Sequence, residues 1–288
     1  MNEDTTLKEK VVIITGCSSG IGRALAFEFH QKGYRTFPTA RRPESVEELA
    51  SQGLESVHLD VAESSSIKKG ISTVIERTGH IDILVNNAGF NPFGPIVEVP
   101  IEQVRLLFET NVIGPIAVIQ EVFRYMAQQG SGRIVNIGSA AGLLPNPFGG
   151  PYSASKAALH LLSEVLRMEC APFGIDVVVV QPGSVRSNIS AAGSIGIDRY
   201  QSQSSLYRAV YPQILRRANA SQLNPMPAEE FAEKLVQEVT KKEAPRVIRL
   251  GAGADFIAEM AKRPGPELER IFAQQFELDS LHKKVGGP

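Results

Sequence analysis

A tyrosine and a lysine four residues apart are the side chains of this chain best suited to chemistry. Tyr152 and Lys156 belong to Tyr-Ser-Ala-Ser-Lys, inside a segment from Tyr152 to Ala171 that has good helix formers and no glycine. Residues four apart lie on one face of a helix. An ammonium group beside a phenol favours the phenolate and lowers the pKa of the phenol from its usual value of about 10. The pair is therefore predicted to exchange a proton near neutral pH.

A tyrosine and a lysine at this spacing also occur on the exposed face of ordinary helices. Two other features favour chemistry here: Ser139 precedes the pair, and a glycine-rich turn lies near the N-terminus. The serine hydroxyl is a hydrogen-bond donor that could stabilise a developing oxyanion, although taken alone it is equally a turn residue.

The glycine-rich turn has the context of a dinucleotide site. Val11 to Thr15 is a short β-branched run, typical of a strand buried on both faces, and Thr-Gly-Cys-Ser-Ser-Gly-Ile-Gly follows over 15–22. Apolar residues then recur every four positions and predict a helix that Gly33 ends. Glycines let the backbone approach a pyrophosphate, and the helix N-terminus offers free N–H groups to it.

The second predicted strand, Tyr34 to Ala40, ends at Arg41 and Arg42, where NAD-selective proteins often carry an acid. Arginine fits a 2′-phosphate through charge-assisted hydrogen bonds. The sequence thus predicts NADP(H) as the cofactor, with Arg41 the first candidate and Arg42 the second. The alternative is a pair of solvated loop arginines.

Strands alternate with helices along most of the chain, which predicts an α/β fold with one parallel sheet. The further strands are expected at 54–59, 81–85, 133–137, 176–181 and 246–250, and the further helices at 64–78, 101–129, 152–171, 228–240 and 254–276. Gly114-Pro115 is expected to kink the long helix, and Pro264-Gly-Pro266 to break the last one. We expect one domain over 1–288, with a segment covering the site at about 184–222 and a helical extension at about 254–280.

Composition excludes several classes of protein. The chain has 288 residues, 43% of them hydrophobic, and a net charge of −1, which gives no electrostatic footprint for nucleic acid. Cys17 and Cys170 are its two cysteines, and no Cys/His spacing suits zinc, so no metal is expected. No apolar run reaches the roughly 18 residues of a membrane span. We expect a soluble cytoplasmic protein, with peripheral attachment to a membrane left open.

Several motifs together resemble the short-chain dehydrogenase/reductase family, over residues 10 to 250. The matching residues lie in the family's order, with no departure at the four catalytic positions: Thr15-Gly-Cys-Ser-Ser-Gly-Ile-Gly22, Asp60, Asn86-Asn-Ala-Gly89, Asn111, Ser139, Tyr152-Ser-Ala-Ser-Lys156 and Pro182-Gly183. The resemblance implies a Rossmann-type, doubly wound fold with a seven-stranded parallel sheet ordered 3-2-1-4-5-6-7. It also implies a homodimer or homotetramer.

The resemblance implies reversible hydride transfer between NADP(H) and a ketone or secondary alcohol. Tyr152 would protonate the carbonyl oxygen, Ser139 would donate a hydrogen bond to it, and Lys156 would lower the tyrosine pKa and hold the ribose. Asn111 would hold a water linking Lys156 to solvent, or would cap a backbone irregularity; the two are compatible. The other cofactor contacts that it implies are Gly16, Ser18, Ser19, Gly20, Ile21, Arg41, Asp60, Val61, Asn87, Ala88, Gly89, Pro182, Gly183, Val185 and Ser187.

Within the family the chain is similar to NADPH-dependent 1-acyldihydroxyacetone-phosphate reductases and, more remotely, to 17β-hydroxysteroid and retinol dehydrogenases. The expected pocket lining is mostly apolar: Phe90, Pro92, Phe93, Leu143 to Phe148 and 188–215. This favours a bulky or lipid-like ketone, and hence a carbonyl reductase. The alternatives are a steroid or retinol dehydrogenase working oxidatively, and a protein that senses NADP(H) without turnover.

Overall fold

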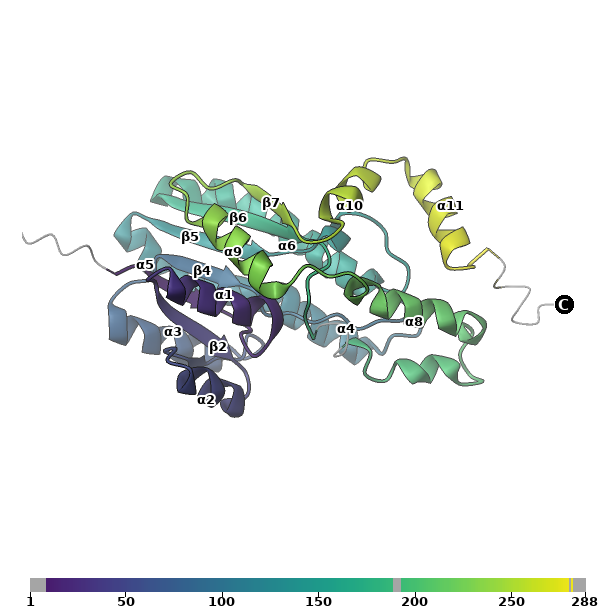
Figure 1. Ribbon diagram of the computed structural model, residues 1–288, viewed down its shortest axis with the longest axis horizontal. Coiled ribbons are helices and arrows are strands. Elements are labelled where there is room, and N and C mark those ends of the chain that lie inside the picture. Colours follow the sequence, from purple (N-terminus) through teal and green to yellow (C-terminus); the bar gives the residue numbers. More distant parts are fainter. Residues whose placement is uncertain (1–8, 189–192, 280, 282–288) are drawn as a thin grey trace, which may run out of the picture.

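The computed structural model describes residues 9–188, 193–279 and 281, and its centre is one parallel β-sheet (Figure 1). The strand order is β3-β2-β1-β4-β5-β6-β7, which confirms the expected topology. The strands are β1 Val11–Ile14, β2 Arg35–Ala40, β3 Val57–His58, β4 Ile83–Asn86, β5 Gly132–Ile137, β6 Ile175–Pro182 and β7 Val247–Leu250. Because the strands are parallel, their carboxyl ends share one edge, and the loops that follow them meet there.

Helices cover both faces of the sheet, as strands buried on both sides require. One face packs against α1 and α9, through Leu25, Phe29 and Phe231 among others; the opposite face packs against α3 and α5, with Ile71 and Val122 fully buried. The helices around the sheet are α1 Gly20–Gln31, α2 Pro43–Ser51, α3 Ser64–Thr78, α4 Ile101–Phe108, α5 Gly114–Gln129, α6 Gly150–Cys170 and α9 Ala228–Val239.

A third apolar cluster lies beyond the carboxyl edge of the sheet, where α8 (Tyr211–Asn219) and α11 (Gly265–Gln275) extend in Figure 1. Tyr200 and Tyr211 are buried in this cluster, so they pack the segment that covers the site. Residues 189–192 of the predicted covering segment, and 280 of the predicted extension, lie outside the described residues. The break at Pro264-Gly-Pro266 is confirmed, because α10 (Ala254–Met260) ends before it and α11 begins within it.

The long helix over 101–129 departs from expectation at one point. A π-helical turn over Glu109–Ile113 separates α4 from α5, and it contains Asn111. The helix continues through Gly114-Pro115, where a kink was expected. A proline inside a helix leaves the carbonyl four residues earlier, here that of Asn111, without its usual N–H partner, and π-helical turns and prolines both accompany helix irregularities. The irregularity therefore lies directly before Gly114-Pro115 and includes Asn111.

The same helical stretch is long and apolar enough, by length and composition alone, to be a candidate membrane span, which sequence inspection did not anticipate. Leu107, Val118, Val122 and Met126 on this stretch are fully buried, most of them in the cluster against the sheet. Because its apolar side chains pack against the sheet, this stretch has the packing of a core helix.

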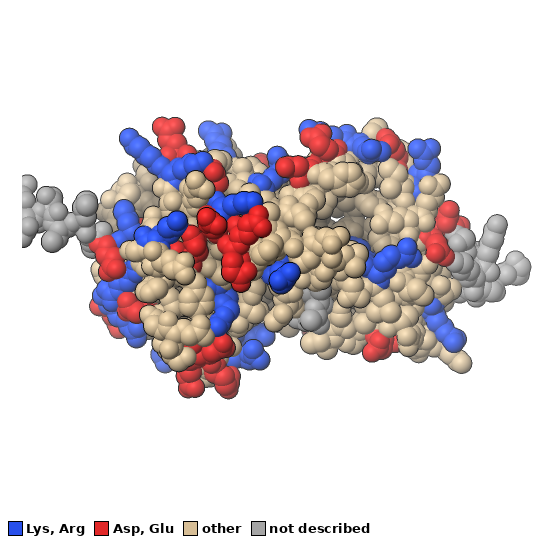
Figure 2. Space-filling model, in the orientation of Figure 1, with Lys and Arg blue, Asp and Glu red and all other residues tan. Residues whose placement is uncertain are grey.

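Charges of both signs are interspersed on the face of the molecule shown in Figure 2. No large basic area is visible on that face. This distribution agrees with the net charge of −1.

Candidate functional site

Helix α6 brings Tyr152 and Lys156 to the carboxyl end of β5. Both side chains are buried, with 9% and 4% of their surface exposed. Lys156 Nζ donates a hydrogen bond to the carbonyl of Ile137, the last residue of β5, at 2.8 Å. The same Nζ lies 5.8 Å from the centre of the Tyr152 ring. The predicted pair is therefore assembled, one turn apart on the buried face of the helix.

The expectation that the pKa of the Tyr152 phenol is lowered is wrong, because this pKa is raised. Burial raises the pKa of the Tyr152 phenol above its ordinary value, because a buried phenolate loses its hydration. A hydrogen bond from Ser139 and the charge of Arg217 oppose this rise in the pKa of Tyr152. Burial also lowers the pKa of Lys156 to about 8. Residue spacing could not reveal how much of either group is desolvated.

Ser139 lies directly after β5 and hydrogen-bonds the Tyr152 phenol through its side chain. The backbone N–H of Ser139 donates to Nε2 of His160 at 3.3 Å, and His160 lies about two turns after Tyr152 on α6. This bond requires a neutral imidazole, and burial, with a smaller contribution from Lys156, lowers the pKa of His160 to about 4. His160 thus positions the serine.

Asn111 is completely buried and joins two elements of the site. Its Oδ1 accepts from the N–H of Phe90 at 3.2 Å, and its Nδ2 donates to the Phe90 carbonyl and to Ser155 Oγ, each at 3.1 Å. A β-carbon added at Gly89 would stand 3.1 Å from Asn111 Oδ1 and 3.6 Å from Lys156 Nζ. Glycine at this position therefore leaves a small gap between the amide and the ammonium.

A chain of buried polar side chains fixes α6 to the sheet, and sequence reasoning missed it. Asn86 donates to Asn136 at 2.9 Å, Asn136 donates to Ser163 at 2.8 Å, and Ser163 donates to the Leu159 carbonyl at 2.6 Å. The signal for this chain of side chains was available in the sequence: Asn86 and Asn136 are polar residues in central strands, at positions expected to face the core.

The glycine-rich turn is held by hydrogen bonds to the end of β4. Asn87 Nδ2 donates to the carbonyls of Thr15 and Gly16 at 2.9 and 3.0 Å, and the N–H groups of Asn87 and Ala88 donate to Thr15 Oγ1. Thr15 belongs to the sequence motif, but no role was predicted for it; its hydroxyl positions the residues after β4. Asn87 therefore shapes the turn rather than standing free.

The turn fits a dinucleotide. Gly16 and Gly20 have φ of +73° and +59°, which residues with a side chain rarely adopt. A β-carbon added at Gly16 would also stand only 2.7 Å from the α-carbon of Ala88. Helix α1 follows with no acidic residue in its first turn, and Ser19 at its N-cap makes no side-chain cap bond. Free N–H groups at a helix start suit a pyrophosphate.

The other predicted cofactor residues also lie along the carboxyl edge. Arg41 and Arg42 are exposed immediately after β2, and neither forms an ion pair with any residue that the structure describes. Asp60, after β3, accepts from the N–H of Ala62 at 3.0 Å. The remaining members are the exposed Ser18, the partly buried residues 19–21, Val61 after Asp60, Pro182 at the end of β6, and Gly183, Val185 and Ser187 after it. Ser187 lies against the glycine turn, because a β-carbon added at Gly20 would be only 2.9 Å from the β-carbon of Ser187.

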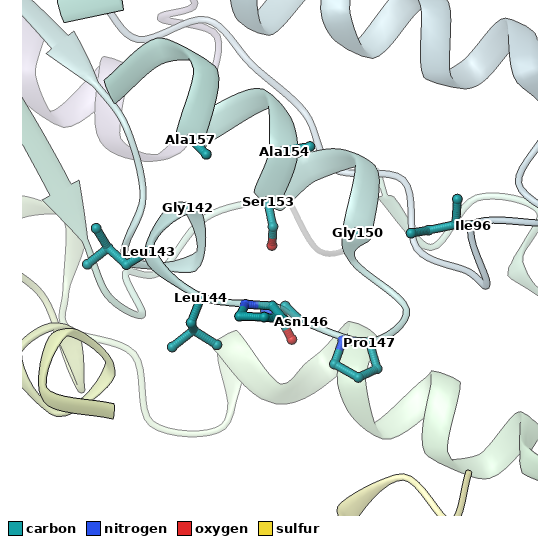
Figure 3. A pocket seen from close by; sticks show the side chains of 11 residues that line it. Ile96, Gly142, Leu143, Leu144, Asn146, Pro147, Gly150, Ser153, Ala154 and Ala157 are labelled. Atoms are coloured by element: carbon teal, nitrogen blue, oxygen red, sulfur yellow. The ribbon is translucent and has the colours of Figure 1, made fainter. Parts of the chain in front are cut away.

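Two cavities flank these residues. One, of about 520 Å³, is lined by Leu143 to Pro147, as expected, together with Ile96 and the α6 residues Ser153, Ala154 and Ala157 (Figure 3). The other, of about 650 Å³, lies against α1 and includes Ser18, Ser19 and Ser187. Phe93 and Phe148, expected in the lining of the first cavity, are instead buried in the third apolar cluster.

Cys17, within the glycine turn, is fully buried, and burial raises the pKa of its thiol to about 12. A thiol held in its neutral form is a poor nucleophile. Cys17 therefore fills space in the turn. Cys170 is also buried and unpaired.

In a comparison with known protein families, residues 10–194 match the family described as short chain dehydrogenase. Two relatives are the NADPH-dependent 1-acyldihydroxyacetone phosphate reductase of Schizosaccharomyces pombe, 38% identical over 185 residues, and a short-chain dehydrogenase of Pyricularia oryzae, 32% identical over 277 residues. These alignments cover 64% and 95% of this chain, and 62% and 97% of the relatives. The crystal structure of a short-chain dehydrogenase from Streptomyces avermitilis, 29% identical, superposes with a TM-score of 0.73 and covers 97% of this chain and 99% of its own.

The neutral state of His160 predicts how stability depends on pH. Its pKa is 6.5 in the unfolded chain and about 4 when folded, so its contribution to stability is complete above pH 6.5 and is lost as the pH falls toward 4. The loss corresponds to about 3 kcal/mol at about 1.4 kcal/mol per pKa unit. Urea unfolding of wild type and His160→Gln between pH 7 and 4 measures it. The variant should lose less stability over this range, and identical pH dependence in the two proteins would contradict the assignment.

Proposed function

Because the chain belongs to the short-chain dehydrogenase family and is an oxidoreductase that acts on CH–OH groups, we propose that it is an NADPH-dependent ketone reductase with a bulky, lipid-like substrate. The observation that carries this proposal is the buried Tyr152 phenol, which Ser139 hydrogen-bonds and Lys156 faces from the next turn. The 520 Å³ cavity against α6 has leucine and proline walls, and its lining includes Ser153, the residue after Tyr152; this supports the substrate class.

The choice of NADP(H) rests on the exposed Arg41 after β2, where no acid stands to bind the ribose hydroxyls. The name of the Schizosaccharomyces reductase supports both the cofactor and a ketone attached to an acyl chain. That protein is longer than its matched region, so its substrate is a guide to chemical class only.

When bound, the cofactor would supply the hydride that reduces the carbonyl carbon. Tyr152 gives its phenolic proton to the carbonyl oxygen, and its raised pKa keeps that proton in place at neutral pH. Ser139 donates a hydrogen bond to the same oxygen as negative charge develops there. The carbonyl oxygen therefore takes the place between these two hydroxyls.

Lys156 restores the proton of Tyr152 after each cycle. Its pKa of about 8 lets it both give and take a proton near neutrality. The gap that Gly89 leaves between Lys156 and Asn111 holds the water that connects the ammonium to solvent. Asn111 fixes that gap through its bonds to Phe90.

The active unit would be a homo-oligomer. Leu161, Val165 and Met168 on α6, with Ile101 at the start of α4 and Ile113 at the end of the π-helical turn, are large apolar side chains that are 39% to 69% exposed. Helix α6 contacts both α4 and the π-helical turn. Exposed apolar surface of this kind marks an interface, and a second copy of the same face is its occupant.

Replacing Tyr152 by phenylalanine should lower kcat with the best ketone by about 10²- to 10⁴-fold, because a general acid contributes that much. NADPH affinity, measured by fluorescence titration, should stay close to wild type. The matched control is Tyr125→Phe on α5, which should keep full turnover. Near-normal kcat in Tyr152→Phe would contradict the mechanism.

Arg41→Asp should lower the ratio of kcat/KM for NADPH to that for NADH by about 10- to 100-fold, since a hydrogen bond to a charged group contributes about 1.5 to 3 kcal/mol. Arg42→Asp is the matched comparison at the neighbouring position and should change the ratio less. An unchanged ratio in Arg41→Asp would overturn its assignment to the 2′-phosphate.

Leu161→Glu should convert the oligomer to monomer in light scattering, because a charge would be buried without a partner at the interface. Leu223→Glu places the same charge at another exposed leucine and should leave the mass unchanged. A monomeric wild type, or an unaffected Leu161→Glu oligomer, would show that this face is not the interface.

A further inference from the structure

Arg217 is a charged residue that the mechanism above does not use. It lies on α8, in the segment that covers the site, and desolvation lowers the pKa of its guanidinium. Its neighbour Arg216 on the same helix is exposed. One arginine of the pair therefore faces water, and the other is turned toward the protein.

The partners of Arg217 are neutral. Its Nε donates to the side-chain oxygen of Asn146 at 2.7 Å, and its guanidinium lies 5.5 Å from the centre of the Phe93 ring. Nothing in the described part of the chain provides it with a carboxylate within ion-pair distance, and its two Nη groups have no acceptor there. Arg217 is half-buried, and a cation partly removed from water is stabilised by an opposite charge.

The position of Arg217 places this charge next to the reacting groups. Its charge acts on the Tyr152 phenol, and the phenol acts on it in return. Nη2 lies along the loop before α6, where a β-carbon added at Gly149 would be 3.4 Å away. The free end of the guanidinium is therefore held between the covering helix and the N-terminal end of the helix that carries Tyr152.

We propose that Arg217 binds an oxyanion of the substrate, so that the ketone reduced at Tyr152 carries a carboxylate or phosphate close to its carbonyl group. This inference rests on the proposed ketone reduction and specifies its substrate class. Arginine suits the role because its Nη groups present parallel donors to two oxygens of such a group.

The cavity of about 520 Å³ offers space for the rest of such a substrate. Asn146, which holds Arg217, also lines this cavity, and its other walls are largely apolar. Figure 3 shows the Ser153 hydroxyl pointing into it, and this hydroxyl is buried without a hydrogen-bond partner. The site thus combines an anion-binding end with apolar space and one free hydroxyl, which fits an amphiphilic ketone and refines the expectation from apolar walls alone.

The test compares ketones that differ in one charge. The first pair is 1-decanoyl-dihydroxyacetone phosphate and 1-decanoyl-dihydroxyacetone, and the second is 4-oxodecanoate and its methyl ester. For wild type, kcat/KM should be higher for the charged member of at least one pair, and the pair that responds distinguishes phosphate from carboxylate. In Arg217→Met the ratio of charged to neutral kcat/KM should fall by about 10- to 100-fold, mainly through KM, as expected for a lost charge-assisted bond.

Two variants separate recognition from structure. Arg216→Met removes the same charge from the exposed side of α8 and should keep the wild-type ratio. Arg217→Lys should restore part of the ratio, because it returns a point charge without the planar donors. Equal losses on charged and neutral ketones in Arg217→Met, or no preference for charge in wild type, would overturn the proposal while leaving ketone reduction intact.

If NADPH were oxidised with none of the four ketones, ketone reduction itself would be contradicted for this substrate class. The anion site would then be judged by calorimetric titration of 1-decanoyl-dihydroxyacetone phosphate into the NADPH complexes of wild type and Arg217→Met. Binding to wild type at least 10-fold tighter would support the site, and equal affinity would overturn it.

Discussion

The buried Lys156 ammonium is the interaction on which the rest of the site depends. It has no carboxylate partner among the described residues, and its hydrogen bond goes to the carbonyl of Ile137 at the end of β5. A buried cation with one fixed acceptor constrains α6 to lie with this turn against the sheet edge. Tyr152, one turn earlier, is thereby placed beside Ser139, the second residue after that carbonyl. Hydrogen bonds from Asn136 to Ser163 and from Ser139 to His160 secure the same helix further along.

Two cations around one phenol explain the electrostatics of the site. Burial raises the pKa of Tyr152 and lowers that of Lys156, while Arg217 acts on the phenol from the covering segment. Both cations are held by neutral acceptors, a backbone carbonyl and an asparagine oxygen. The positive potential therefore stays available for negative charge that arrives with a substrate or develops on its carbonyl oxygen.

Sequence predicted what depends on local patterns and on motif order. Apolar runs and periodicity located the seven strands and most helices within a few residues, and the motif Tyr-x-x-x-Lys placed both groups on one helix face. Gly114-Pro115 was the local signal of an irregularity, and a π-helical turn lies directly before it; the bonds of Asn111 with Phe90, 21 positions away, could not be predicted from local sequence. Arg217 was missed because its contacts with Asn146 and Phe93 are long-range. The predicted lowering of the Tyr152 pKa was wrong because residue spacing does not show how deeply a side chain is buried, and burial raises this pKa.

Tracing the hydride tests the central claim most directly. The protein would be incubated with NADPH carrying deuterium at both C4 positions and with the ketone that it reduces best, and the alcohol would be analysed by mass spectrometry and NMR. The site described above predicts one deuterium on the carbinol carbon, with the hydroxyl proton supplied through Tyr152 and exchanged with solvent. An alcohol without deuterium at that carbon, or NADPH bound with no alcohol formed from any ketone, would contradict it.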